Sequence, residues 1–354
     1  MLNVCATVQR CIGGVSGANQ TAPLMEGRLK NKEAPMMKKK IVSLVLAFML
    51  CLSCVSALAA EAWTVTCPWA PSGVAAMVNQ KAASLSTTYS QDYVLVANAE
   101  KGDTATINSW LTKYTEADPQ MCFIGEGMFG ITAILDPERM NFTYDDFEYV
   151  ENLYSSIFVA SARKELGLTS IDALKAYLEE GNQIMVGTNG ATGSEAFLAA
   201  ALIGAMGYGD QFYLIPYESA AEAAQAVARG EVDIAVSHQS QILETWQQGG
   251  VDVFAAFDGE PIAQGPFKGV EGVGQYGYPY FRNRCFIFAK AGADEQKIAD
   301  LKALYAQILT DEEMVDWLNN TMLLEADMMT EEEVIAHIDN VKNIVDEYYD
   351  LVAE

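Results

Sequence analysis

Segments with the composition of β-strands alternate with segments of helical periodicity along most of this chain. The β-rich run 63–67 is followed by apolar residues at helical spacing over 74–85, and the run 183–187 is followed by a helical pattern over 194–206. Regular alternation of this kind is typical of α/β proteins, in which helices cover the faces of a largely parallel sheet. We therefore expect an α/β fold.

The remaining elements follow from the same patterns. The other expected strands are 93–97, 121–124, 148–154, 158–162, 212–216, 233–237, 251–257 and 284–290. The other expected helices are 106–114, 170–179, 220–229 and 241–248, and the tail is also helical. Thr310 with Glu313, and Thr330 with Glu333, have the spacing of capping boxes at helix starts. The Gly-, Pro- and Tyr-rich stretch 259–280 has no clear period and is expected to be a long connection.

The region 36–59 has the order of a secretory signal. Lys38–Lys40 is basic, residues 41–52 are apolar, and Ala57-Leu58-Ala59 fits a cleavage site. The apolar run is short for a membrane anchor. Lipid attachment at Cys54 is a second alternative. Residues 1–35 do not fit in front of a signal, so we expect them to be upstream sequence before a start at Met36 or Met37.

The charge of the chain excludes one class of partner. Seven of its 22 Lys and Arg residues and two of its 47 Asp and Glu residues precede residue 60, which leaves a net charge near −30 on residues 60–354. A chain this acidic has no basic stripe with which to displace counterions from phosphates. We expect no nucleic-acid partner and a monomer.

Cysteine and histidine are too sparse for a metal site or a disulfide framework. After residue 60 the cysteines are Cys67, Cys122 and Cys285, and they are widely spaced. Such cysteines behave as small buried apolar residues in strands. His238 and His337 lie on different segments. We therefore expect neither a bound metal nor a cofactor.

Three junctions between a strand and the following helix are rich in small residues. They are Pro68–Gly73, Gly187–Ser194 and Pro216–Ala220. In α/β sheets such loops lie at the carboxyl ends of the strands, where ligands bind. The free N–H groups at a helix start can hold a carboxylate without a charged side chain. Each loop alone is equally compatible with an ordinary turn.

These motifs resemble a family. The order of Pro-Trp-Ala-Pro-Ser-Gly at 68–73, the Gly-rich loop before residue 194, Ile-Pro-Tyr at 215–217 and Arg-Gly-Glu-Val-Asp at 229–233 is similar to the tripartite tricarboxylate transporter solute-binding proteins. The resemblance runs through nearly all of residues 60–354. The chain departs from the family pattern in lacking an Asp early in the first helix and in carrying Glu218 where a Lys is common.

The resemblance implies two α/β lobes of a type II-like periplasmic-binding-protein fold, each with a central sheet and flanking helices, that close like a clamshell. We expect 60–156 to begin the first lobe, 157–282 to form the second, and 283–354 to return to the first with the C-terminal helices. It also implies a small carboxylate ligand held largely by backbone N–H groups. The implied partners are the integral membrane permease subunits of an ion-driven importer.

Two further positions are candidates for contact with the ligand. Glu126, between two glycines after a strand, is either a solvated turn residue or an acceptor for a ligand ammonium or hydroxyl. Arg282 and Arg284 are either carboxylate-binding groups or partners in surface salt bridges. The expected ligand-binding residues are Trp69, Ser72, Gly73, Glu126, Thr188, Asn189, Gly190, Thr192, Gly193, Ser194, Tyr217, His238 and Arg282.

Other functions remain open on the sequence alone. The same fold could serve another importer or a sensor kinase. An exported hydrolase would need a nucleophile and a base, for which Ser194 and His238 are the conceivable pair. The chain has neither a G-x-S-x-G elbow nor an H-E-x-x-H motif, so we expect a binding protein and not an enzyme.

The signal region generates a direct prediction. The exported protein should begin at or near Ala60, because cleavage follows Ala57-Leu58-Ala59. N-terminal sequencing of the secreted protein checks this. A chain that starts before Met36, or one that keeps the apolar run 41–52, would contradict it.

Overall fold

The computed structural model describes residues 60–352, and these form two mixed β-sheets of five strands each. The first sheet has the order β2-β1-β3-β10-β4, in which β1 pairs in parallel with β2 and β3, and β10 runs antiparallel to β3 and β4. Its strands are β1 (Glu61–Cys67), β2 (Tyr93–Ala99), β3 (Gln120–Gly125), β4 (Phe147–Ser156) and β10 (Asn283–Lys290).

The second sheet has the order β7-β6-β8-β5-β9, with β5 antiparallel to both of its neighbours. Its strands are β5 (Phe158–Arg163), β6 (Ile184–Asn189), β7 (Phe212–Tyr217), β8 (Ile234–His238) and β9 (Val251–Ala256). Each sheet with its helices is a lobe. The α/β architecture expected from the sequence is confirmed.

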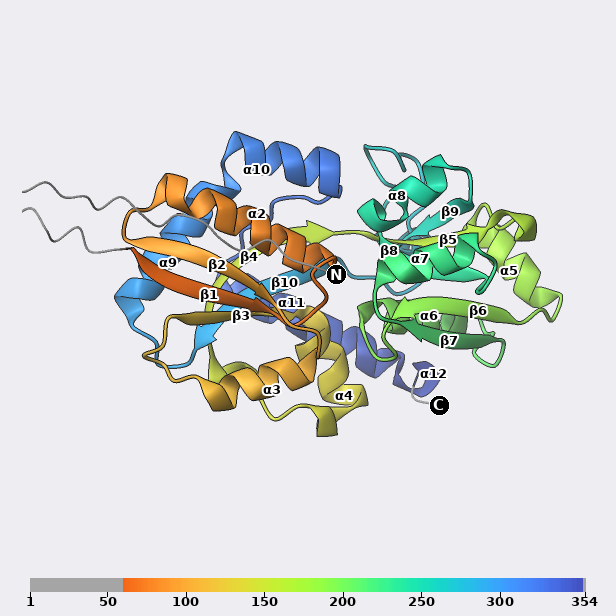
Figure 1. Ribbon diagram of the computed structural model, residues 1–354. Coiled ribbons are helices and arrows are strands. Elements are labelled where there is room, and N and C mark those ends of the chain that lie inside the picture. The colour runs from red at the N-terminus through yellow and green to blue at the C-terminus, as the bar shows by residue number, and fades with distance from the viewer. Residues whose placement is uncertain (1–59, 353–354) are drawn as a thin grey trace, which may run out of the picture. The chain divides into compact units, whose positions relative to one another are not determined.

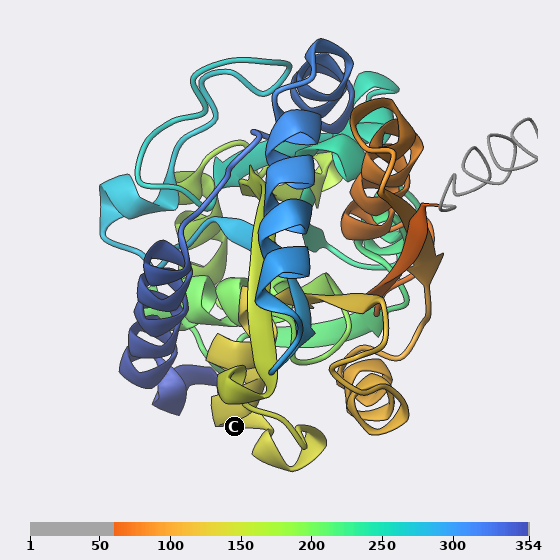
Figure 2. The same cartoon turned by 90° about the vertical axis from the view of Figure 1, so that its left-hand side faces the viewer.

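Helices cover both faces of each sheet (Figure 1). On the first sheet, α2 (Val74–Tyr89), α9 (Glu295–Leu309) and α10 (Glu312–Trp317) cover one face, and α3 (Thr104–Lys113) covers the other. On the second sheet, α5 (Ile171–Glu179) and α6 (Ser194–Ala205) lie opposite α7 (Ala220–Ala228) and α8 (Gln239–Gln247). Figure 2 shows α9 running along β4, with which it is in contact.

The chain passes from one sheet to the other at two adjacent strand ends. Strand β4 is followed after the single residue Ile157 by β5, and β10 brings the chain back beside β4. We propose on this placement that the lobes divide near residues 156 and 283. Helix α11 (Glu331–Glu347) contacts both cores, since Val334 packs with the first and Val345 with the second. Helix α11 therefore lies against both lobes.

The strands of the first sheet are rich in buried apolar side chains. Cys67, Cys122 and Cys285 are all free and buried in strands of the first sheet, as expected of small apolar residues. Phe288 on β10 packs edge-on against Phe129 and Tyr144. Such aromatic contacts add to the burial of apolar area. The sequences of these strands are continuous apolar runs because helices cover both faces of the first sheet.

Of the two capping boxes predicted from the sequence, one is confirmed and one is wrong. Thr330 and Glu333 form the expected capping box at the start of α11. The box expected for Thr310 and Glu313 is wrong, because Asp311 caps α10 by accepting a hydrogen bond from the Met314 N–H, and Thr310 ends α9. Asp is at least as good an N-cap as Thr, so the adjacent residue takes the position.

One helical segment has no counterpart in the sequence analysis. The π-helical turn η1 (Met128–Thr132) and the short α4 (Ala133–Leu135) follow β3 after only two residues. Met128, Phe129 and Ile131 are buried in this segment, so it has no polar face whose period could reveal it.

The expected signal region, the upstream segment 1–35 and Cys54 lie outside the described residues. No helix within 60–352 has both the length and the apolar character needed to cross a membrane.

Helix α11 depends on close packing at Gly130. A Cβ at Gly130 would lie 2.6 Å from Cγ1 of Val341. Gly130→Ala should therefore push α11 away and lower the free energy of unfolding by about 1–3 kcal/mol. Urea denaturation measures this, with Gly209→Ala as control because only one atom lies within 4 Å of a Cβ there, at 3.9 Å. Equal stability of the two variants would contradict the packing argument.

Candidate ligand-binding site

A cavity of about 550 Å³ is lined by loops that follow strands of both sheets. The segments after β1, β3, β6, β7 and β8 all contribute residues to its wall. Ligands in α/β proteins bind at the carboxyl ends of strands, because several loops and helix starts converge there. A volume of this size suits a small organic ligand.

Helix α2 opens onto this cavity with an uncapped N-terminus. Its N-cap is Gly73, which has no side chain to accept the first N–H groups, and its first turn contains no acidic residue. Gly73, Val74 and Ala75 line the cavity. The N–H groups of a first helical turn have no intrahelical acceptor and carry the positive end of the helix dipole. This end of α2 can therefore receive an anion.

Helix α6 begins on the other side of the cavity with different chemistry. The loop before it turns at Gly190, whose φ of 75° lies in the left-handed region that favours glycine. Thr188 Oγ1 donates to the Gly190 carbonyl at 2.7 Å, which holds the turn. The N-cap Gly193 again provides no side-chain cap, but Glu195 stands in the first turn and also lines the cavity.

Glu126 is a fully buried carboxylate, and none of residues 60–352 forms a salt bridge with it. It accepts hydrogen bonds from Ser194 Oγ at 3.0 Å, Asn283 Nδ2 at 2.9 Å and the Arg284 N–H at 2.8 Å. Burial raises the pKa of Glu126, and these donors oppose the rise. Because Ser194 belongs to the second lobe and the others to the first, Glu126 joins the two lobes at the cavity wall.

Glu195 is only 6% exposed and has no ion-pair partner among residues 60–352. Burial raises the pKa of Glu195 to about 7. Its own N–H and the Asn189 amide favour the ionised form, while the charges of Glu126 and Asp103 disfavour it. At neutral pH this carboxyl is therefore poised between its two protonation states.

Asp103 and Arg139 form a charged pair in the wall. Arg139 Nη2 lies 3.3 Å from Asp103 Oδ2, and Arg139 Nη1 donates to Thr192 Oγ1 of the second lobe at 2.8 Å. Asp103 has φ 51°, an uncommon value for a residue with a side chain, and does not cap the helix that it precedes. Burial raises the pKa of Asp103, against the opposing charge of Arg139.

Two further contacts cross between the lobes at the cavity. Lys101 Nζ donates to Glu218 Oε2 at 2.6 Å, and Ser156 Oγ lies 2.8 Å from His238 Nδ1. Burial lowers the pKa of His238 to about 3, so its ring is neutral at physiological pH. His238 can therefore exchange hydrogen bonds but cannot supply positive charge.

Ten of the thirteen expected residues line the cavity together. They are Trp69, Gly73, Glu126, Asn189, Gly190, Thr192, Gly193, Ser194, Tyr217 and His238. The other three do not reach its wall. Ser72 is exposed in the turn before α2, Thr188 is buried beneath the Gly190 turn, and Arg282 lies elsewhere.

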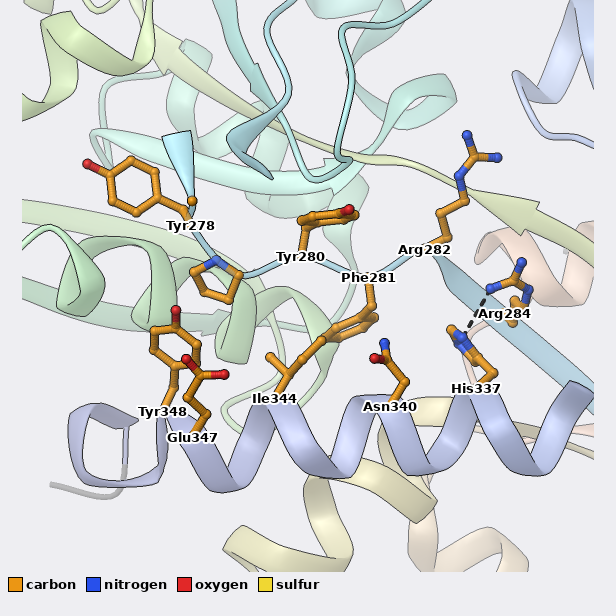
Figure 3. Close-up of a pocket in the computed structure, with 12 residues that line it drawn as sticks. Tyr278, Tyr280, Phe281, Arg282, Arg284, His337, Asn340, Ile344, Glu347 and Tyr348 are labelled. Carbon is orange, nitrogen blue, oxygen red and sulfur yellow. Dashed lines mark hydrogen bonds between the residues drawn. The ribbon is translucent and has the colours of Figure 1, made fainter. Parts of the chain in front are cut away.

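Arg282 and Arg284 border a separate hollow of about 430 Å³ beside α11 (Figure 3). Arg282 pairs with Asp258 at 2.9 Å and with Glu325 at 2.7 Å, and Arg284 Nε lies 2.7 Å from Asp327. Figure 3 also shows Arg284 against His337. Both guanidinium groups are thus occupied in salt bridges, which was one of the two roles left open for them.

The sequence analysis missed several polar residues of the wall. They are Lys101, Asp103, Arg139, Glu195, Gln241 and Asn283. Glu195 directly follows the predicted Gly-rich loop, so its position was a usable signal. Arg139 lies after the unpredicted segment 128–135, and only the fold brings it to Thr192.

The described residues include no cluster of three His, Cys, Asp or Glu side chains that could hold a metal ion. Ser194 Oγ bonds to Glu126 and His238 bonds to Ser156, so the nucleophile and base imagined for a hydrolase are engaged with other groups.

No protein-family model matches the chain, and no curated protein sequence matches it. Solved structures do share its fold. The MatC protein of Rhodopseudomonas palustris with bound malate is 17% identical, with a TM-score of 0.69, over 82% of this chain and 98% of its own. The periplasmic binding protein BugD is 15% identical, with a TM-score of 0.71, over 83% and 98%. A TctC solute binding protein from Polaromonas is 15% identical, with a TM-score of 0.63, over 81% and 98%.

The chain therefore has the two-lobed α/β fold of periplasmic binding proteins. Within that class it resembles the tripartite tricarboxylate transporter solute-binding proteins, as its motifs indicated, and the structure of a TctC protein shares its fold.

The buried Glu195 generates a prediction about stability. The pKa of Glu195 is about 7 in the folded protein and near 4.5 in the unfolded protein. The free energy of unfolding therefore falls as the pH rises from about 4.5 to 7, because the unfolded chain ionises first. Glu195→Gln should have little effect at pH 4 and should stabilise the protein by up to about 3 kcal/mol at pH 8.

Urea denaturation at both pH values measures the effect. Glu295→Gln is the matched control, because Glu295 lies in the first turn of α9 but is exposed. A gain in stability that is the same at pH 4 and pH 8 would rule out a raised pKa as its cause.

Proposed function

We propose that this protein is an extracytoplasmic solute-binding protein that captures a small carboxylate and delivers it to a membrane importer. The observation that carries the proposal is the uncapped, acid-free start of α2 at the wall of a cavity between two lobes. Three first-turn N–H groups there need an acceptor, and a carboxylate provides one.

Backbone donors suit the composition of this chain. The N–H groups of residues 191–193 form no hydrogen bond within the described residues, so the Gly-rich loop adds donors from the second lobe. A carboxylate held in this way needs no cation beside it, because several N–H groups share its charge. Glycines at 190 and 193 allow the backbone to approach the ligand closely.

Arg139 supplements these donors. It is the one arginine among the residues that line the cavity, and Asp103, Asp136 and Thr192 hold its guanidinium. A guanidinium has five N–H donors, so these three acceptors leave others for a ligand. Arg139 therefore takes the role for which the sequence analysis considered Arg282.

Contacts between the lobes would couple ligand capture to closure. Glu126 with Ser194 and Arg139 with Thr192 both cross from the first lobe to the second at the cavity wall. A ligand that touches both lobes stabilises the closed arrangement by its differential affinity for that state.

The comparisons support the ligand class. The structure of MatC contains malate, and another Rhodopseudomonas palustris protein of this fold is described with adipate. By analogy, the partners of this chain are the integral membrane subunits of a tripartite importer, and the protein acts outside the cytoplasmic membrane as a monomer.

Ligand screening tests the function. A carboxylate at one hundred times its Kd should stabilise the fold by about 2.7 kcal/mol. Thermal-shift assays with di- and tricarboxylates, hydroxy acids, aromatic acids and amino acids should therefore show at least one clear increase in Tm. A response to neutral sugars alone would overturn the proposal.

Two arginine variants locate the site. Arg139→Gln should weaken binding of the hit by about tenfold or more, because a charged hydrogen bond is lost. Arg282→Gln is the matched control and should leave Kd unchanged, since its pairs lie outside the cavity. Calorimetry measures both, and the reverse order of effects would place the site elsewhere.

A further inference from the structure

We infer that the ligand is an amino carboxylate whose protonated amine is received by Glu195 and neighbouring oxygen acceptors. This inference rests on the proposed function, which assigns one ligand carboxylate to the start of α2, Arg139 and the N–H groups of 191–193. It adds a protonated amine to the ligand, received by the acidic side chain of Glu195 in the first turn of α6.

The first argument is the difference between the two helix starts. Both α2 and α6 begin at a glycine without a side-chain cap, so both have free N–H groups. The first turn of α2 has no acid, whereas that of α6 contains Glu195. When it is ionised, the Glu195 carboxylate places negative charge in the first turn of α6, and a ligand ammonium beside it would favour that ionised form. A second carboxylate there would meet repulsion, while an ammonium would meet attraction.

The second argument is the set of unsatisfied acceptors in the wall. Gln241 Oε1 and Asn283 Oδ1 are buried and receive no hydrogen bond from the described residues. Glu195 forms no salt bridge within residues 60–352. All three side chains line the same cavity, and the residues Glu195 and Asn283 are more than nine-tenths buried.

Buried acceptors without donors cost stability, so their presence calls for a ligand that supplies donors. A protonated amine carries three N–H donors and no acceptor. A simple dicarboxylate carries acceptors only and would leave these oxygens unsatisfied. The chemistry of the wall therefore favours an ammonium over a second carboxylate.

The third argument is the balance of charge. The charged residues of the cavity wall are four acids and two bases, namely Asp103, Glu126, Glu195, Glu218, Lys101 and Arg139. Lys101 pairs with Glu218 and Arg139 with Asp103, which leaves Glu126 and Glu195 without a cation. Donors from Ser194, Asn283 and the Arg284 backbone satisfy Glu126. Glu195 is thus the one acid of the wall that a ligand cation can pair with.

Matched pairs of ligands test the inference. Each pair is an amino acid and the acid in which hydrogen replaces the ammonium: aspartate with succinate, glutamate with glutarate, alanine with propionate, and phenylalanine with 3-phenylpropionate. Calorimetry on the wild-type protein should show at least one amino acid binding roughly tenfold or more tightly than its partner, because only the ammonium can pair with Glu195.

The variant Glu195→Gln should remove most of this preference by weakening the amino acid and leaving the simple acid unchanged or tighter. Asp103→Asn is a second variant that lowers the negative charge of the wall and should reduce the same preference. Glu222→Gln is the control and should keep the preference, because Glu222 is exposed in the first turn of α7 and outside the cavity wall.

Each result decides something. Simple acids that bind as tightly as their amino partners would overturn the inference and leave the proposed function intact. A preference that survives Glu195→Gln would also overturn it, because another group would then receive the amine. If none of these acids binds but a hydroxy acid or a tricarboxylate does, the inference is overturned and the proposed function stands. Failure of every carboxylate in the wider screen to bind would overturn both.

Discussion

The buried carboxylate of Glu126 is the interaction on which the arrangement of the site depends. It lies between the end of β3 and the start of η1, and its donors come from the start of α6 and the start of β10. A buried charge is tolerated only when hydrogen bonds replace its lost hydration. Three chain segments are therefore tied to one point, and the first turn of α6, with Glu195, is held at the cavity wall.

An acidic chain can bind an anion if it uses the backbone for the purpose. The start of α2 provides N–H groups and a favourable dipole without any lysine or arginine. In the proposed complex, Glu195 in the first turn of α6 then adds selectivity to the cavity wall. The departures from the family pattern, which include Glu218 in place of a lysine, fit this arrangement because Glu218 pairs with Lys101 across the cavity.

The sequence predicted the elements whose signals are local. Ser170 caps α5, and Thr330 and Glu333 form their capping box, because each bond closes within three residues. The segment 128–135 escaped detection because residues 128–132 are all buried, which leaves no alternation of polar and apolar faces. Asp311, and not Thr310, is the N-cap of α10. Either of these adjacent residues could take the position, and the spacing to Glu313 does not decide between them.

The sequence by itself determined the α/β class, the order of the main strands and helices, and the three loops that line the cavity, since glycine positions and strand–helix alternation are local properties. Only the tertiary structure decided which charges face that cavity. Arg139 lies 53 residues from Thr192 and Glu126 lies 157 residues from Asn283, and each pair is joined by a hydrogen bond. Arg282 forms salt bridges with Asp258 and Glu325 and does not line the cavity. Electrostatic partners depend on distances in space, and the path of the chain between two sheets sets those distances.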